Sequence, residues 1–142
     1  GTKNGALFGE ALVICNDSLK SDFRYNIKQK GALLAKGRLL GIQFMELFKN
    51  NLFFDLASHA NEMATLLQDA FIENNYKLLI NSPTNQIFPI LPNEHMRKLN
   101  EKYSFIKWED YDENHTVIRL VTSWATNKEK VLEFIDDLKT LQ

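Results

Sequence analysis

The sequence predicts an α+β fold, in which helices cover one face of an antiparallel sheet and a long helix comes before it. Three observations carry this prediction. Helical periodicity fills most of the first half of the 142-residue chain, short β-rich runs separated by turn residues follow Asn75, and the chain closes on an amphipathic helical pattern. Strands that are grouped apart from long helices are typical of an α+β layer. A chain of this length suits one domain with its own core.

The apolar run over residues 6–15 is expected to form a buried strand. It is short, it contains the β-branched Val13 and Ile14, and Gly9 interrupts it. Cys15, at its end, is interpreted as a small core side chain without a catalytic role.

Residues 17–49 carry a helical pattern, which follows the cap and turn residue Asn16. Its second half is apolar on almost every side, which indicates burial by the chain's own domain and by a partner subunit. Gly31, Gly37 and Gly41 would each cost about 1 kcal/mol relative to alanine inside a helix. Either they let another element pack closely, or Gly31 separates two helices, and the sequence leaves both alternatives open.

A second helix is expected over residues 55–74, because apolar residues recur at helical spacing on one face. The face consists of Leu56, Ala60, Met63, Leu67, Ala70 and Phe71. His59 lies beside this face, where it would act as a ligand or base, or simply pack. We interpret it as a packed residue, because no second histidine or cysteine stands at metal-ligand spacing. No metal site is therefore predicted.

Four strands are expected in the second half, over residues 76–80, 86–90, 104–108 and 116–122. Pro89 and Pro92 favour an edge position or a strand end. A short helix over residues 93–101 carries His95, and a polar turn over residues 111–115 leaves His115 in solvent. Both histidines are interpreted as surface residues.

The sequence from Thr126 to Glu129 resembles a capping box and predicts the start of a final helix. The apolar face of that helix consists of Val131, Phe134, Ile135, Leu138 and Leu141. This helix is expected to pack on the sheet.

Composition argues against several classes of function. The 17 basic and 18 acidic residues give a net charge of -1, so nothing predicts a nucleic-acid or membrane surface. No apolar run approaches the roughly 20 residues that span a bilayer. The single cysteine excludes an internal disulfide and fits a reducing cytoplasm.

Lys3 stands in the segment Gly1-Thr2-Lys3-Asn4-Gly5, directly before the apolar run. Glycines allow sharp turns and a close approach to a ligand. A lysine amine can form a Schiff base with a carbonyl. An ordinary solvated lysine is the alternative interpretation of this segment.

Several segments resemble the threonine aldolase and aromatic amino acid β-eliminating lyase family, whose members use pyridoxal 5'-phosphate (PLP) and have fold type I. GTKNG followed by LFGEALV is similar to the PLP-lysine segment of that family. The similarity continues in the family's order through KQKGALLAKGR (28–38), HAN (59–61), TN (84–85) and IRLVTSW (118–124). Each segment is short, and the resemblance rests on their occurring in the same order as in the family.

The resemblance implies that Lys3 binds PLP covalently and is catalytic. It also implies a C-terminal fragment of a longer enzyme, in which residues 1–16 end the large PLP domain and residues 17–142 form the small domain with its connecting helix. The expected partners are an amino acid substrate, the missing N-terminal domain and further copies of the chain, as a dimer or tetramer. The expected location is the cytoplasm.

Arg119 is the second candidate site residue. Strand alternation places it on one face with Val117 and Val121, opposite Ile118 and Leu120. A guanidinium binds a carboxylate through two hydrogen bonds, and the resemblance implies that Arg119 holds the substrate α-carboxylate. The alternatives are an arginine that reaches into solvent, or one that pairs with a structural acid.

Lys28 stands where many relatives carry an arginine, so the resemblance implies a place near the cofactor phosphate of a neighbouring subunit. A solvated helix lysine is the alternative. The expected reaction is cleavage of L-threonine or L-allo-threonine to glycine and acetaldehyde, by the complete protein only. The alternatives are β-elimination from aromatic amino acids, and a non-catalytic domain left by truncation or proteolysis.

Overall fold

The structure is a computed structural model of the chain, and it describes residues 1–141. The chain divides into two compact units, Gly1–Phe53 and the residues from Phe54 onward. The division between the two units is a property of this chain's internal contacts. The predicted boundary at residues 16 and 17 concerns the domains of a complete enzyme, and it stays a prediction.

The second unit contains the antiparallel sheet. Its strands are β1 (Lys77–Leu78), β2 (Gln86–Ile87), β3 (Pro89–Pro92), β4 (Ile106–Asp110) and β5 (His115–Val121). All pairs are antiparallel, and β5 pairs with β2, β3 and β4 while β1 pairs with β3. The two prolines stand at the ends of β3, where the missing N–H groups interrupt the ladder least. The strand-end alternative is therefore the correct one.

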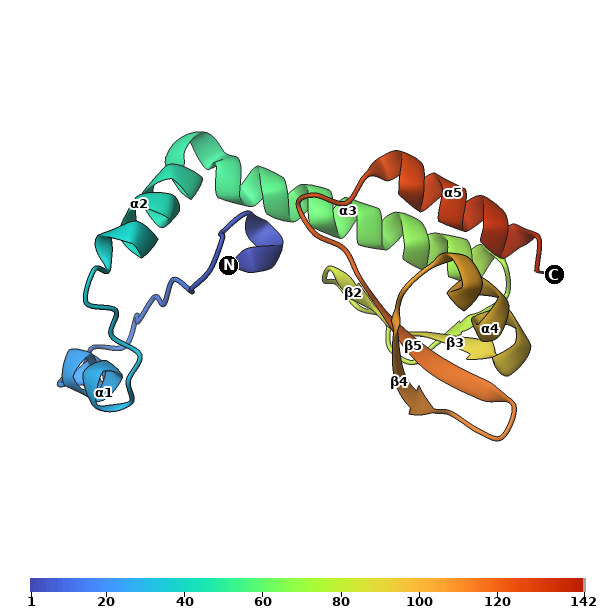
Figure 1. Cartoon of the computed structure of the whole chain (residues 1–142), viewed down its shortest axis with the longest axis horizontal. Coiled ribbons are helices and arrows are strands. Elements are labelled where there is room, and N and C mark those ends of the chain that lie inside the picture. The colour runs from blue at the N-terminus through green and yellow to red at the C-terminus, as the bar shows by residue number, and fades with distance from the viewer. Residues whose placement is uncertain (142) are drawn as a thin grey trace. The chain divides into compact units, whose positions relative to one another are not determined.

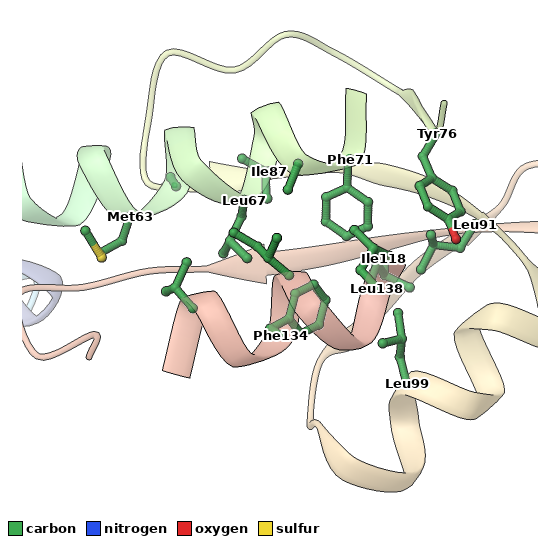
Figure 2. Packing of buried hydrophobic residues seen from close by; sticks show 14 residues of the cluster. Met63, Leu67, Phe71, Tyr76, Ile87, Leu91, Leu99, Ile118, Phe134 and Leu138 are labelled. Atoms are coloured by element: carbon green, nitrogen blue, oxygen red, sulfur yellow. The ribbon is translucent and has the colours of Figure 1, made fainter. Parts of the chain in front are cut away.

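Two helices pack on one face of this sheet, α3 (Leu52–Glu73) and α5 (Lys128–Lys139), and Figure 1 shows them lying along it. Leu99 from α4 (Asn93–Lys102) joins the same core, as Figure 2 shows. The core consists of Met63, Ala64, Leu67, Ala70, Phe71, Tyr76, Ile87, Leu91, Leu99, Ile118, Val131, Phe134, Ile135 and Leu138. The predicted α+β fold, with helices on one face of an antiparallel sheet, is confirmed.

The cap of α5 differs from the prediction by one residue. Asn127, not Thr126, is the N-cap, and its side chain accepts hydrogen bonds from the N–H groups of Glu129 and Lys130. The Thr126 hydroxyl instead accepts from the Ser123 N–H at 2.8 Å, within the turn after β5. Asparagine is one of the best N-cap residues, which explains why it takes this position.

The predicted strand over residues 6–15 is absent from the first unit. The stretch has no regular secondary structure, Leu7 and Val13 are more than four-fifths exposed, and Cys15 is exposed as well. An apolar run forms a strand only when a partner strand satisfies its backbone groups, and no described strand pairs with it. The interpretation of Cys15 as a core side chain is wrong for the same reason.

The helical pattern predicted over residues 17–49 forms several short helices rather than one continuous helix. They are η2 (Asp17–Leu19), α1 (Phe23–Gln29), α2 (Arg38–Leu47) and η3 (Lys49–Asn51), after the N-terminal turn η1 (Thr2–Asn4). Gly31 has a φ of +72°, in the left-handed region that ends helices. Gly31 thus separates two helices, which was one of the two alternatives.

The apolar surface of α2 is mostly uncovered within this chain. Phe44 and Leu47 are buried, whereas Leu39, Ile42 and Met45 are each at least half exposed. The sequence predicted that this helix is buried on almost every side, but the described residues of this chain cover only part of it. Among the described helices, none combines the length and hydropathy that a membrane crossing needs.

Candidate functional site

Arg119 lies near the middle of β5, on the face of the sheet opposite the helical core. Its neighbour Ile118 is completely buried against the helices, and alternation turns Arg119 the other way. Ile106 of β4 is the residue paired with Arg119 across the ladder. The central position of β5 in the sheet gives Arg119 a rigid base.

The guanidinium of Arg119 packs on an aromatic ring rather than on an acid. Its Cζ lies over the Trp108 ring, 5.3 Å from the centroid. Its Nε is buried and has no hydrogen-bond partner, and no carboxylate of the described residues forms an ion pair with it. A buried donor without a partner costs about 1–3 kcal/mol. The charge therefore has no acidic partner among residues 1–141, so the alternative of pairing with a structural acid has no support within the described residues.

Lys3 lies in the turn η1 and is exposed. Gly5 closes this turn in the left-handed conformation, with φ at +93°. The Asn4 side chain anchors the turn by donating to the Phe53 carbonyl oxygen at 2.8 Å. No hydrogen bond or ion pair of Lys3 exists among the described residues. The Lys3 amine is thus accessible, and it lies on a turn that the Asn4 side chain anchors to the Phe53 carbonyl oxygen.

Lys3 belongs to the first unit and Arg119 to the second, so each is placed within its own unit only. Lys28 lies in the last turn of α1, where it is exposed. This position fits the solvated-lysine alternative. The implied role near a cofactor phosphate stays a prediction.

His59 is a packed helix residue, as interpreted from the sequence. Its Nε2 lies 2.8 Å from the Thr126 carbonyl oxygen, which ties α3 to the turn before α5. Among the described residues, no group of three or more histidine, cysteine or acidic side chains could hold a metal ion.

The other two histidines each contact a polar side chain, and only His95 is less exposed than the sequence predicted. His95 Nδ1 lies 2.8 Å from the Tyr76 hydroxyl, and His115 Nδ1 lies 2.9 Å from a carboxylate oxygen of Asp112. The His115 ring and the Asn114 N–H hold the pKa of the Asp112 carboxyl below its usual value. Both histidines line a cavity of about 480 Å³. His95 is half-buried and contacts the Tyr76 hydroxyl, so its surface interpretation is wrong. The His115 side chain is 42% exposed, so the prediction that it reaches solvent is confirmed.

Trp108 is the residue near Arg119 that sequence reasoning missed. The expected strand over residues 104–108 ended on it, and the structure places it inside β4. The centroid of a second aromatic ring, that of Phe88, lies 5.3 Å from the centroid of the Trp108 ring, and the two ring planes are inclined at 68°. The only sequence signal was an aromatic residue on the strand before the arginine strand.

The known proteins that are similar to this chain include three threonine aldolases. Two curated relatives named low specificity L-threonine aldolase, from Pseudomonas sp. (strain NCIMB 10558) and Pseudomonas aeruginosa, are each 30% identical to this chain, and cover 99% and 98% of it. A solved threonine aldolase structure from Leishmania major is 46% identical, covers 99% of the chain and superposes with a TM-score of 0.92. This chain matches the C-terminal part of a threonine aldolase.

The match covers only part of each relative. The chain spans 40% of the length of the two curated threonine aldolases and 41% of the solved one. No family model matches the chain. The resemblance to the threonine aldolase family predicted from the short motifs is confirmed. The relatives are threonine aldolases by name, a class of lyase, and threonine aldolases in general are PLP enzymes.

Proposed function

We propose that the complete protein is a PLP-dependent lyase that cleaves the Cα–Cβ bond of L-threonine or L-allo-threonine, giving glycine and acetaldehyde. The names of the relatives support this reaction. They favour it over β-elimination from aromatic amino acids. The observation within this chain that most supports the proposal is the guanidinium of Arg119, which is partly buried, lies over the Trp108 ring and has no acidic partner among the described residues.

Arg119 is proposed to bind the substrate α-carboxylate. A guanidinium stays charged and offers parallel N–H groups that match the two carboxylate oxygens. Because Arg119 is shielded on one side by an indole ring, its charge interacts more strongly with an incoming anion than it would in bulk water. Binding through Arg119 would fix the orientation of the amino acid.

Lys3 is proposed to hold PLP through a Schiff base. Its features fit that group: an accessible amine, no competing carboxylate among residues 1–141, and a turn fixed by the Asn4 side chain. When bound, PLP supplies an electron sink for charge that develops at Cα. No described residue is assigned as the base for the β-hydroxyl proton.

The remainder of the proposed enzyme would supply what this chain lacks. We propose an N-terminal PLP domain, consistent with the 40% coverage of the relatives, and a homo-oligomer in the cytoplasm. The exposed apolar residues of α2 support a covering by further protein.

The test replaces Arg119 in the complete enzyme. Losing one partner of a charge-assisted pair should cost roughly 2–5 kcal/mol, so Arg119→Ala should raise KM for threonine about 30- to 5000-fold. Arg119→Lys should restore only part of the affinity, because an ammonium lacks the planar fork. PLP binding, followed by absorbance, should persist in both variants but be lost in Lys3→Ala. An unchanged KM with a lowered melting temperature would assign Arg119 a structural role instead.

A further inference from the structure

The pairing of β4 with β5 contains an irregularity at Trp108. Lys107 pairs with Ile118 and Glu109 pairs with Val117, so Trp108 is an extra residue without a partner on β5. A β-bulge of this kind bends the strand locally and changes the direction of a side chain. On β5 the irregularity lies opposite Ile118 and Val117, and Ile118 is the residue next to Arg119. This bulge therefore sets where the Trp108 indole lies.

The Trp108 indole contacts both another aromatic ring and the Arg119 guanidinium. Phe88, which connects β2 to β3, approaches the Trp108 ring edge-on with centroids 5.3 Å apart. The Arg119 Cζ lies over the same indole, also at 5.3 Å. Trp108 is still half exposed, so burial alone does not explain its place. Its ring contacts among the described residues are those with the Phe88 ring and the Arg119 cation.

We propose that Trp108 is a positioning residue that holds the Arg119 guanidinium in the orientation needed to bind the substrate carboxylate. The inference rests on the proposed function of Arg119. An arginine on a flexible side chain loses rotamer entropy when it binds an anion. A guanidinium that is already packed over an indole loses less, while the N–H groups at its edge remain available for hydrogen bonds. The Arg119 Nε, which has no partner in the described chain, shows that no other side chain fixes this group by hydrogen bonding.

The experiment uses the complete PLP-loaded enzyme and two probe ligands that differ in one group. Glycine carries the carboxylate, and glycinamide replaces it with a neutral amide. Cofactor absorbance gives both dissociation constants. Losing a cation–π contact of this kind should weaken glycine binding about 5- to 30-fold in Trp108→Leu and leave glycinamide binding within twofold. KM for threonine should rise with kcat nearly unchanged, since the interaction is present in both ground and transition states.

Two further variants make the result specific. Trp108→Phe keeps an aromatic ring that attracts a cation less strongly than an indole, so it should weaken glycine binding about 2- to 5-fold. If Trp108→Leu does not fold, Trp108→Phe still tests the proposal. Tyr111→Leu is the matched control, because Tyr111 is also a half-exposed aromatic residue and directly follows the last residue of β4. It should leave the ratio of the two dissociation constants unchanged.

A double-mutant cycle with Arg119→Ala separates this inference from the proposed function. If Trp108 acts through Arg119, Trp108→Leu should have no further effect on glycine binding once Arg119 is removed. Equal weakening of glycine and glycinamide, or additive losses in the cycle, would overturn the positioning role. If Arg119→Ala weakens glycine binding while both Trp108 variants do not, the inference fails and the carboxylate role stands. If Arg119→Ala itself has no effect on glycine binding, the proposed function of Arg119 fails, and the inference with it.

Discussion

Phe71 is the largest fully buried side chain among the described residues of the second unit. It is completely buried, and its ring meets Tyr76 edge-on at 5.7 Å and Phe134 at 5.9 Å. It thus joins α3 to α5 and to the segment that leads into β1. Aromatic pairs in this geometry add to the stabilisation from burial.

Phe71→Ala should therefore lower the free energy of unfolding of the second unit by about 3–5 kcal/mol. The neighbouring Ile72 is half exposed, so Ile72→Ala is the matched control and should change it by less than about 1 kcal/mol. Chemical denaturation of both variants measures the two losses. Equal losses would show that Phe71 is not a centre of the core.

At the same scale, the sequence placed Arg119 correctly but could not place Trp108. The alternation of a strand is a local property, so the side of the sheet that Arg119 occupies followed from its neighbours Ile118 and Leu120. Trp108 depends on a bulge, which is a property of two paired strands. His95 shows the same limit, because its partner Tyr76 becomes a neighbour only in the folded chain.

Among the elements, α3 was the easiest to predict and residues 6–15 the hardest. The apolar face of α3 repeats over many turns, and its observed bounds lie within three residues of those predicted. The run over residues 6–15 has the composition of a strand, but a strand also needs a paired neighbour. Gln43 instead contacts its backbone, donating to the Phe8 carbonyl oxygen and accepting from the Leu7 N–H.

The start of α5 depends on a single cap. Asn127→Ala removes the acceptor for two backbone N–H groups and should cost about 0.5–2 kcal/mol. Asn100, an exposed residue of α4, provides the control, since Asn100→Ala removes no cap and improves helix propensity. Thermal unfolding followed by circular dichroism compares the two variants. A larger loss in Asn100→Ala would contradict the assignment of Asn127 as the cap.

On the scale of the whole second unit, one charged cluster links α4 to α5. Lys102 contacts Asp137 at 2.6 Å and Glu133 at 2.8 Å, and the Tyr103 hydroxyl donates to Asp137. These contacts lower the pKa of Asp137, mainly through Lys102 and then Tyr103, and they raise the pKa of Lys102.

The sign of the pH dependence follows from these directions. The Asp137 contribution is present above its unfolded pKa of about 3.9 and is lost as the pH falls through the lower folded value. The Lys102 contribution is present below its unfolded pKa of about 10.4 and is lost only above the higher folded value. Stability from this cluster should thus be constant between about pH 5 and pH 10. Asp137→Asn should flatten the acid limb of a plot of melting temperature against pH, and an unchanged limb would exclude the cluster as its source.

Taken as a whole, the chain has a well-formed core only in its second unit. The first unit buries Ala6, Phe44 and Leu47 and leaves many large apolar side chains exposed. The sequence predicted that α2 would be covered on most sides, and that part of the prediction needs protein beyond this chain. The relatives are long enough to provide it, since the match covers 40% of each curated one.

The 142-residue chain alone should therefore have no aldolase activity. The family resemblance implies that the ring that stacks on PLP and the acid that contacts its pyridine nitrogen lie outside this chain. Lys3 can still form a Schiff base without these groups, but a correctly oriented cofactor needs more than one contact. Incubating the chain with PLP and threonine should produce no more acetaldehyde than the Lys3→Ala variant of the same chain, whereas the complete enzyme should produce it readily. Sustained turnover by the chain alone, absent from its Lys3→Ala variant, would show that these 142 residues already contain a working site.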